Sequence, residues 1–183
     1  MTAVLLDRDG VINRNRADYV KSWREFEFLP RSLEALRLLA DRQVPVVVVS
    51  NQSAVGRGII SRQELRRVNE NMLVAVKARG GSIEGILCCP HAPETGCACR
   101  KPRPGLLLEA LRRFRLERRH TYMVGDSTSD LEAARQAGVP FVMVLSGRAS
   151  RNGLRPSPWG GPLVHVARDL KEAVEWILRR EGL

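Results

Sequence analysis

Three aspartates of this sequence follow short apolar segments, and their spacing suits the binding of a divalent cation. Asp7 and Asp9 lie two residues apart after the apolar run Ala3–Leu6, and Asp126 follows a second apolar run, Thr121–Val124. Carboxylates that are brought together away from water repel one another and are costly to desolvate. A Mg²⁺ ion held by a few carboxylates and a substrate phosphate offsets that cost. A turn or a helix cap would explain either string separately, whereas together they favour a magnesium site.

The four cysteines lie within residues 88–99, in the string CCPHAPETGCAC. Disulfides usually join distant segments, so this clustering indicates a metal site rather than disulfides or a metal-free loop of thiols. Three thiolates and one imidazole suit a closed tetrahedral Zn²⁺ site, with Cys89, His91, Cys97 and Cys99 as the predicted ligands. All four cysteines are the rival ligand set. Adjacent residues of an extended chain point to opposite faces, so we place Cys88 in the core and expect a structural zinc ion.

Strand-like and helix-like segments alternate along the chain and must position these residues. The predicted strands are Ala3–Leu6, Pro45–Val49, Ile83–Cys89, Thr121–Val124, Phe141–Leu145 and Leu163–Ala167. The predicted helices are Ser32–Arg42, Arg62–Arg79, Pro104–Arg113, Leu131–Ala137 and Leu170–Arg180, and residues 148–162 form a predicted loop. This alternation predicts an α/β fold: a Rossmann-like, mostly parallel sheet with helices on both faces, in a single domain over residues 1–183.

Polar residues follow the predicted strands where ligands of such folds bind, beyond the carboxyl ends of the strands. Asp7 and Asp9 follow the first strand, Ser50 and Asn51 the second, and Asp126 the fourth. We therefore expect these side chains to converge at one edge of the sheet and to form the functional site.

Four short motifs, in this order and strand context, resemble those of the haloacid dehalogenase-type phosphatases over nearly the whole chain. They are DRDGV from Asp7, SNQ from Ser50, RKP from Arg100 and GDSTSD from Gly125. The resemblance implies that Asp7 is the nucleophile and forms an aspartyl-phosphate. It also implies that Asp9 protonates the leaving alcohol and then activates the hydrolytic water.

The same resemblance implies the ligands of the metal and of the phosphoryl group. The Asp7 carboxylate, the Asp9 backbone carbonyl and Asp126 would hold Mg²⁺. Ser50 and Lys101 would bind phosphoryl oxygens, and Asp130 would be a supporting carboxylate. No insertion in the sequence is long enough for a large cap domain, so a capless form of the fold with a zinc-bound loop is expected.

The zinc loop narrows the resemblance to a branch that contains heptose-bisphosphate phosphatases and histidinol-phosphatases. Residues 51–58 (NQSAVGRG) and 99–105 (CRKPRPG) favour the heptose side, although the short loop between His91 and Cys97 also suits the histidinol side. Gly56 stands where Ala is expected, and Ser127 stands where many heptose enzymes have Lys. The substrate-binding residues that the resemblance implies are Tyr19, Asn51, Gln52, Ser53, Arg57 and Arg100.

The chain carries a formal net charge of +10, which suggests either a nucleic-acid binder or a protein that handles small anions. Its arginine-rich segments, 112–119 and 148–155, contain a single aromatic residue for base stacking, Phe114, so a nucleic-acid phosphatase or binder is the less favoured alternative. No apolar run approaches the roughly 20 residues of a membrane helix, and the N-terminus does not resemble a signal peptide. We expect a cytoplasmic monomer that binds a sugar bisphosphate and neither nucleic acid nor a membrane.

Overall fold

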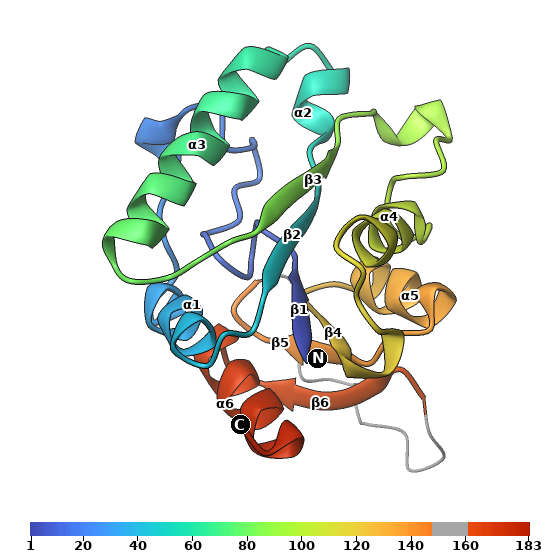
Figure 1. The fold of residues 1–183 in the computed structure, drawn as a ribbon. Coiled ribbons are helices and arrows are strands. Elements are labelled where there is room, and N and C mark those ends of the chain that lie inside the picture. Colours follow the sequence, from blue (N-terminus) through green and yellow to red (C-terminus); the bar gives the residue numbers. More distant parts are fainter. Residues whose placement is uncertain (148–160) are drawn as a thin grey trace.

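A computed structural model of the chain describes residues 1–147 and 161–183, and its strands form one six-stranded sheet (Figure 1). The strands are β1 (Ala3–Leu6), β2 (Val46–Asn51), β3 (Gly85–Cys89), β4 (Thr121–Gly125), β5 (Phe141–Val144) and β6 (Leu163–Ala167). They lie in the order β3-β2-β1-β4-β5-β6, and every pair of neighbours is parallel. The predicted parallel sheet is confirmed. The loop predicted at residues 148–162 lies almost entirely outside the described residues.

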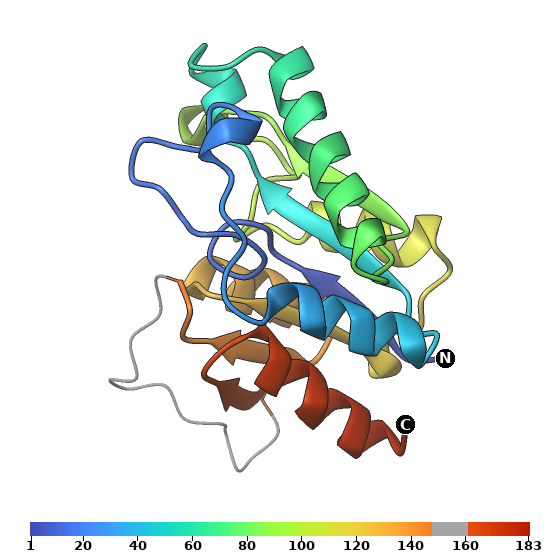
Figure 2. The ribbon, with the colours of Figure 1, turned by 90° about the vertical axis from the view of Figure 1, so that its left-hand side faces the viewer.

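Helices cover both faces of the sheet, as the sequence predicts (Figures 1 and 2). The helices α1 (Ser32–Asp41), α3 (Arg62–Ala78) and α6 (Leu170–Glu181) cover one face, and α4 (Gly105–Arg113) and α5 (Thr128–Ala137) cover the other. Each face has its own buried apolar cluster, because side chains alternate along a strand: Val4 and Leu6 of β1 belong to one cluster and Leu5 to the other. None of the helices that the structure describes is both long and apolar enough to cross a bilayer.

The register of the three central strands explains why the polar residues converge. Leu6, the last residue of β1, pairs with Val48 of β2 and with Val124 of β4. The residues that follow these strands therefore emerge at the same edge of the sheet, and Asp7 and Asp126 are among them. This is the edge at which the sequence predicts the functional site.

Several boundaries differ from the predicted ones. The helix α5 begins at Thr128, three residues before the predicted start, because Ser127 and Asp130 form a capping box that adds a polar first turn. The strand β3 begins at Gly85 rather than at Ile83, and Pro104 is the N-cap of α4 rather than its first residue. A one-turn helix, α2 (Ser53–Gly56), was not predicted.

Candidate active site and metal-binding loop

Three aspartates and one lysine form a compact charged centre at the carboxyl edge of the sheet. Carboxylate oxygens of Asp7, Asp126 and Asp130 all lie within 4.8 Å of one another. The Lys101 ammonium lies 3.0 Å from Asp7 Oδ1 and 2.6 Å from Asp130 Oδ1, and it donates a hydrogen bond to the Val49 carbonyl at 2.8 Å. The sequence predicted that Asp7, Asp126 and Lys101 would lie together. Asp130, which was predicted to be a supporting carboxylate, contacts Lys101 directly and belongs to the cluster itself.

Burial and like charges dominate the electrostatics of this centre. Burial raises the pKa of Asp7 to about 7; Lys101 opposes this rise, and the carboxylates of Asp130, Asp9 and Asp126 add to it. Burial disfavours the charged form of Lys101, but Asp130 and Asp7 outweigh it and raise the pKa of Lys101 above its ordinary value. The lysine therefore stays charged beside the carboxylates of Asp7 and Asp130.

The residues around Asp126 fit a small hard cation. Gly10, at a backbone φ of +92°, and Gly147 approach the Asp126 carboxylate so closely that a Cβ at either position would lie 2.2 Å or less from its Oδ2 atom. Only glycine leaves room for this approach, and the Asp126 side chain is thereby buried beside Asp7 and Asp130. Oxygen donors with excess negative charge are the ligands that Mg²⁺ prefers, so these residues suit a magnesium site.

The Asp9 carboxylate is held apart from the other three by its own set of donors. It pairs with Arg8 (3.0 Å) and accepts hydrogen bonds from Asn13 Nδ2 (2.8 Å) and Gln52 Nε2 (2.7 Å). Burial acts to raise the pKa of Asp9, but Arg8 and these hydrogen bonds outweigh it and lower the pKa below its ordinary value. In this arrangement the Asp9 side chain is not part of the carboxylate cluster that suits magnesium, which leaves only its backbone carbonyl for the predicted ligand role.

Residues at the end of β2 hold Lys101 in place. Ser50 is buried, and its Oγ accepts a hydrogen bond from Gln52 Nε2 at 2.9 Å. The Asn51 amide makes two hydrogen bonds to the backbone of Lys101, 50 residues further along the chain. Ser50 therefore lies one residue from the contact that fixes Lys101, although it does not itself line the cavity described next.

A cavity of about 390 Å³ opens over the charged centre. Its lining includes the residues of the charged centre and Asp9, namely Asp7, Asp9, Lys101 and Asp126. It also includes five of the six predicted substrate-binding residues: Tyr19, Asn51, Gln52, Ser53 and Arg100. Arg57 does not line it: its guanidinium pairs with Glu94 at 3.0 Å. The size of the cavity suits a phosphorylated sugar, and Arg16 and Arg100 give it cationic groups beyond Lys101.

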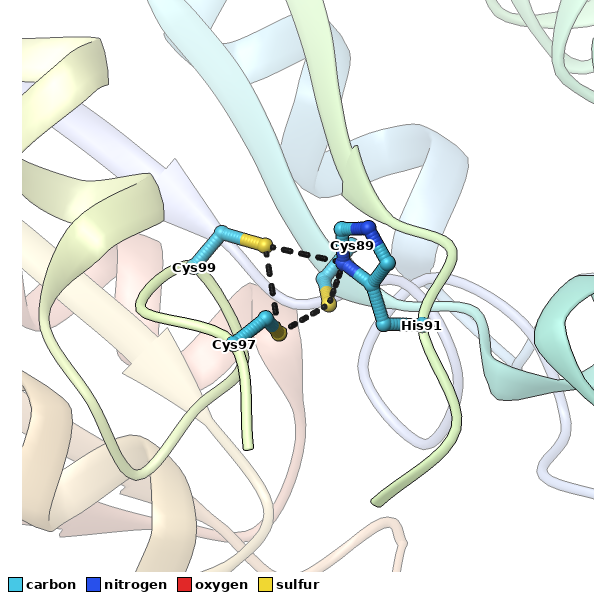
Figure 3. Close-up of side chains that lie close together, drawn as sticks. All are labelled: Cys89, His91, Cys97 and Cys99. Atoms are coloured by element: carbon cyan, nitrogen blue, oxygen red, sulfur yellow. Dashed lines mark hydrogen bonds between the residues drawn. The ribbon is translucent and has the colours of Figure 1, made fainter. Parts of the chain in front are cut away.

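The four predicted zinc ligands meet at one point (Figure 3). Cys89 Sγ lies 3.5 Å from Cys97 Sγ and 3.6 Å from His91 Nδ1, and Cys99 Sγ lies 3.4 Å from Cys97 Sγ and 3.3 Å from the same nitrogen. A regular tetrahedron with zinc–sulfur distances of about 2.3 Å has edges of about 3.8 Å, so these four atoms fit around one zinc ion. Cys88 points to the other side of β3 and packs against a different apolar cluster, as predicted.

The thiols of this cluster are not equivalent. Burial acts to raise the pKa of Cys97, but hydrogen bonds from Cys99 and from the Arg100 backbone lower it to about 6. Burial and the neighbouring thiols raise the pKa of Cys99 to about 12. The cluster thus favours the thiolate at Cys97, and the thiolate is the form of cysteine that binds metal.

The zinc-binding loop is joined directly to α2. The Gln52 amide donates to the Cys89 carbonyl at 2.7 Å, and the Gly56 amide donates to the Pro90 carbonyl at 2.8 Å. A Cβ at position 56 would lie 2.4 Å from the Ala92 nitrogen, which is backbone and cannot easily move. Glycine rather than the expected alanine at this position is therefore explained by the close approach of the loop.

Sequence reasoning missed several residues of the site. Arg8 is fully buried and contacts Asp9. The sequence did not indicate this burial, because an arginine between two aspartates is typical of an exposed segment. Asn15, Arg16 and Ser129 line the cavity. The first two lie in the segment between β1 and α1, and the third lies in the first turn of α5, whose predicted start was three residues too late.

Comparisons with known proteins agree with this geometry. The model of the HAD-hydrolase-like family matches residues 98–173. The chain is 38% identical to the D-glycero-beta-D-manno-heptose-1,7-bisphosphate 7-phosphatase of Bordetella bronchiseptica, over 98% of this chain and 99% of that protein. It is 42% identical to the D-glycero-alpha-D-manno-heptose-1,7-bisphosphate 7-phosphatase of Mycobacterium bovis, over 82% of each chain.

A solved structure shows the same arrangement of the chain. The D,D-heptose 1,7-bisphosphate phosphatase from B. bronchiseptica, complexed with magnesium and phosphate, superposes with a TM-score of 0.90 at 37% identity, covering 98% of this chain and 99% of that one. Identity at this level over nearly the full length, together with the four motifs at the site, decides the family. The chain belongs to the heptose-1,7-bisphosphate 7-phosphatases of the haloacid dehalogenase-like hydrolases.

Proposed function

We propose that this protein is a magnesium-dependent phosphatase that removes the C7 phosphate of D-glycero-D-manno-heptose 1,7-bisphosphate, in the biosynthesis of heptose precursors for surface glycans. The observation that carries the proposal is the juxtaposition of Asp7, Lys101 and Asp126 under a cavity that also holds Arg100. A partly buried nucleophile with a cation beside it suits phosphoryl transfer, and the further cationic groups in the cavity suit a substrate with two phosphates.

In the first step an oxygen of Asp7 attacks the phosphorus of the C7 phosphate. The bond between phosphorus and the C7 oxygen breaks, and Asp9 delivers a proton to that oxygen as the sugar leaves. Because the pKa of Asp9 is lowered in the empty site, Asp9 must take up this proton as the substrate phosphate binds. In the second step Asp9 takes a proton from a water molecule, whose oxygen attacks the phosphorus of the aspartyl-phosphate. Inorganic phosphate leaves, and the Asp7 carboxylate and the Asp9 proton are restored for the next turnover.

Cations around the transferring group stabilise its charge. Lys101 is held beside Asp7 by Asp130 and the Val49 carbonyl, so it is already in place for the phosphoryl oxygens, and Ser50 would add a hydroxyl donor. Magnesium bound by Asp7, the Asp9 carbonyl and Asp126 would neutralise charge on the phosphoryl group. The proton that Asp7 binds with a pKa of about 7 in the metal-free site would be lost when the cation binds.

Zinc would have a structural role in the same site. Cys89, His91, Cys97 and Cys99 would supply all four ligands, which leaves no position for water or substrate. The residues directly after Cys99 are Arg100 and Lys101, so a fixed loop places both cations on the cavity. We assign Arg100, with Tyr19, Gln52 and Ser53, to the part of the substrate that carries the second phosphate.

Three of the proposed substrate contacts have other partners in this structure. The Gln52 amide already bonds Arg8, Asp9 and Ser50. Arg57 pairs with Glu94, so its contact with substrate would require exchange of that partner. The Asn51 amide is bonded at both its oxygen and its nitrogen to the Lys101 backbone, so it acts on substrate by placing the lysine.

We further propose that the protein acts as a cytoplasmic monomer without nucleic acid. The large apolar side chains that are exposed among the described residues lie far apart in the sequence, at Met1, Ile59, Val74, Leu108 and Leu183, which supports the monomer.

The experiment that tests the proposed substrate is phosphate release with Mg²⁺ from both anomers of the heptose bisphosphate, beside histidinol phosphate. A large preference in kcat/KM for one heptose anomer supports the proposal, and its relatives carry names for both anomers. A preference for histidinol phosphate would leave the mechanism in place but show that the proposed substrate is wrong. Tight, salt-sensitive binding of an oligonucleotide would favour the nucleic-acid alternative.

A further inference from the structure

Arg8 is a buried charge whose partners belong to three separate elements. Its side chain is 1% exposed, although it lies between the two aspartates at the start of the site. Nη2 pairs with Asp9 at 3.0 Å and donates to Gln52 Oε1 at 3.1 Å, and Nη1 donates to Asn69 Oδ1 at 3.1 Å. A guanidinium has five N–H donors and no acceptor, so its orientation follows from where the acceptors are fixed.

Asn69 fixes Arg8 from the side opposite to Asp9. It lies in the middle of α3, in a helix that contributes no residue to the lining of the cavity. Its Nδ2 faces the Cys88 thiol at 3.7 Å, and this contact leaves Oδ1 directed at the arginine. Because arginine only donates, the reverse orientation of the amide would place two donors against each other.

The Asp9 carboxylate completes the chain of contacts from α3 to the site. Arg8 meets both of its oxygens, while Asn13 and Gln52 hold one oxygen each. Asp9 lines the cavity, and under the proposed function it must meet first the leaving oxygen and then a water molecule. A carboxylate that serves two successive proton transfers needs a defined position, since a small displacement costs much of the rate.

We propose that Asn69 is a positioning residue for the phosphatase reaction: it acts through Arg8 to fix the carboxylate of Asp9. The role of Asp9 rests on the proposed function, and the contacts of Asn69 and Arg8 are those of the structure. Asn69 does not line the cavity, and its contact toward the reacting groups is the one with Arg8. Its other contact, with the Cys88 thiol, leads away from Asp9. Arg8 itself is a poor site for a test, because its replacement leaves Asp9 without its buried ion-pair partner and threatens the fold.

The variant Asn69→Leu removes the acceptor while it keeps the branched shape of the side chain, and Asn71→Leu, at an exposed position of the same helix, is the matched control. We expect Asn69→Leu to lower kcat about tenfold with KM within about twofold, because a hydrogen bond to a charged group is lost and substrate contacts are kept. Asn71→Leu should leave both constants unchanged. Equal constants for Asn69→Leu and wild type would overturn the proposal. Should Asn69→Leu fail to fold, Asn69→Ala is measured by the same criteria.

A double-mutant cycle with Asp9→Asn separates positioning from a general structural effect. If Asn69 acts through Asp9, then Asn69→Leu costs no further activity, within about twofold, when Asp9 is already replaced. A second tenfold loss in the Asp9→Asn background would show that Asn69 acts in another way. The substrate of the cycle is whichever sugar phosphate the wild-type protein hydrolyses fastest. If heptose bisphosphate is not the substrate, the rates of the wild-type protein show it. If Asn69 does not position Asp9, the double-mutant cycle shows it.

Discussion

Asn51 holds Lys101 by the backbone, with two hydrogen bonds across 50 residues of sequence. Asn51 Nδ2 donates to the Lys101 carbonyl at 3.0 Å, and the Lys101 amide donates to Asn51 Oδ1 at 3.1 Å. The amide of one side chain thus satisfies both polar groups of one peptide residue, and it joins the end of β2 to the zinc-binding loop. The lysine that neutralises Asp7 is therefore positioned by the strand end that also carries Ser50.

Replacement of Asn51 by Leu should separate the lysine from the nucleophile without unfolding the protein. Two buried hydrogen bonds are lost, so we expect a loss of about 2 kcal/mol of unfolding free energy. We also expect kcat/KM to fall about tenfold or more, because Lys101 loses its fixed position. Denaturant unfolding and steady-state kinetics measure the two effects. Unchanged kcat/KM would show that the Lys101 ammonium is fixed by Asp130 and Val49 alone.

We expect one zinc ion per chain. Replacement of a zinc ligand should cost metal and stability, whereas replacement of the remaining cysteine, Cys88, should not. Cys97→Ser should lose zinc and lower the unfolding free energy by roughly 3 kcal/mol or more, because metal binding and folding of the loop are coupled. Cys88→Ser is the matched control, since Cys88 lies outside the cluster. Metal analysis and thermal unfolding decide the outcome. Zinc loss in the Cys88 variant, or its retention in the Cys97 variant, would contradict the ligand set.

The contribution of Asp7 to the stability of the metal-free protein should fall as the pH rises from about 4 to about 7. The Asp7 carboxyl has an ordinary pKa of 3.8, and in the folded metal-free site its pKa is about 7. Between these values the folded state binds a proton at Asp7 that the unfolded state has released, so this contribution decreases with increasing pH and is seen as the difference between wild type and Asp7→Asn.

Magnesium competes with that proton for Asp7, so it should stabilise the protein more at pH 8 than at pH 6. Thermal unfolding with and without Mg²⁺ at both pH values is the measurement. Asp7→Asn is the control, because this variant has no proton to displace and should show a smaller dependence on pH. A larger stabilisation by Mg²⁺ at pH 6 would contradict the account.

The stability of the last turn of α6 should depend on the partly buried carboxylate of Glu181. Glu181 accepts hydrogen bonds from Tyr122, Thr2 and His120. Burial acts to raise the pKa of Glu181, but these bonds, that from Tyr122 foremost, lower it below 4.5. Tyr122→Phe should therefore cost about 1 kcal/mol at neutral pH.

The lowered pKa of Glu181 also fixes the sign of the pH dependence. Its stabilising contribution is present above the unfolded pKa and is lost as the pH falls through the folded one. The difference in unfolding free energy between wild type and Tyr122→Phe should shrink on acidification, as measured by urea unfolding at several pH values. A constant difference would mean that the hydroxyl stabilises the helix without the charge of Glu181.

Local sequence patterns predicted much of the fold because they report burial and capping directly. The run PVVVV predicted β2, and Ser61 caps α3 by accepting from the Glu64 amide at 3.0 Å, as its position suggests. The zinc ligands were predictable because the alternation of side chains along a strand separates Cys88 from Cys89. These inferences need only neighbours in sequence.

Residues whose role depends on distant partners were not predictable in this way. Arg8 is buried only because Gln52 and Asn69, which come from elsewhere in the chain, supply acceptors for its guanidinium. Arg57 was expected in the site by resemblance, but the structure places Glu94 of the zinc-binding loop against it. Sequence spacing gives no measure of such tertiary contacts.

The most direct test of the central claim follows the two phosphates of the proposed substrate by ³¹P NMR. The account predicts that the wild-type protein with Mg²⁺ converts the C7 phosphate of the heptose bisphosphate to inorganic phosphate while the C1 phosphate remains on the sugar. Asp7→Asn should fold and bind substrate but lower the rate roughly a thousandfold or more, because it removes the nucleophile. Loss of the C1 phosphate instead, or full activity of Asp7→Asn, would contradict the account.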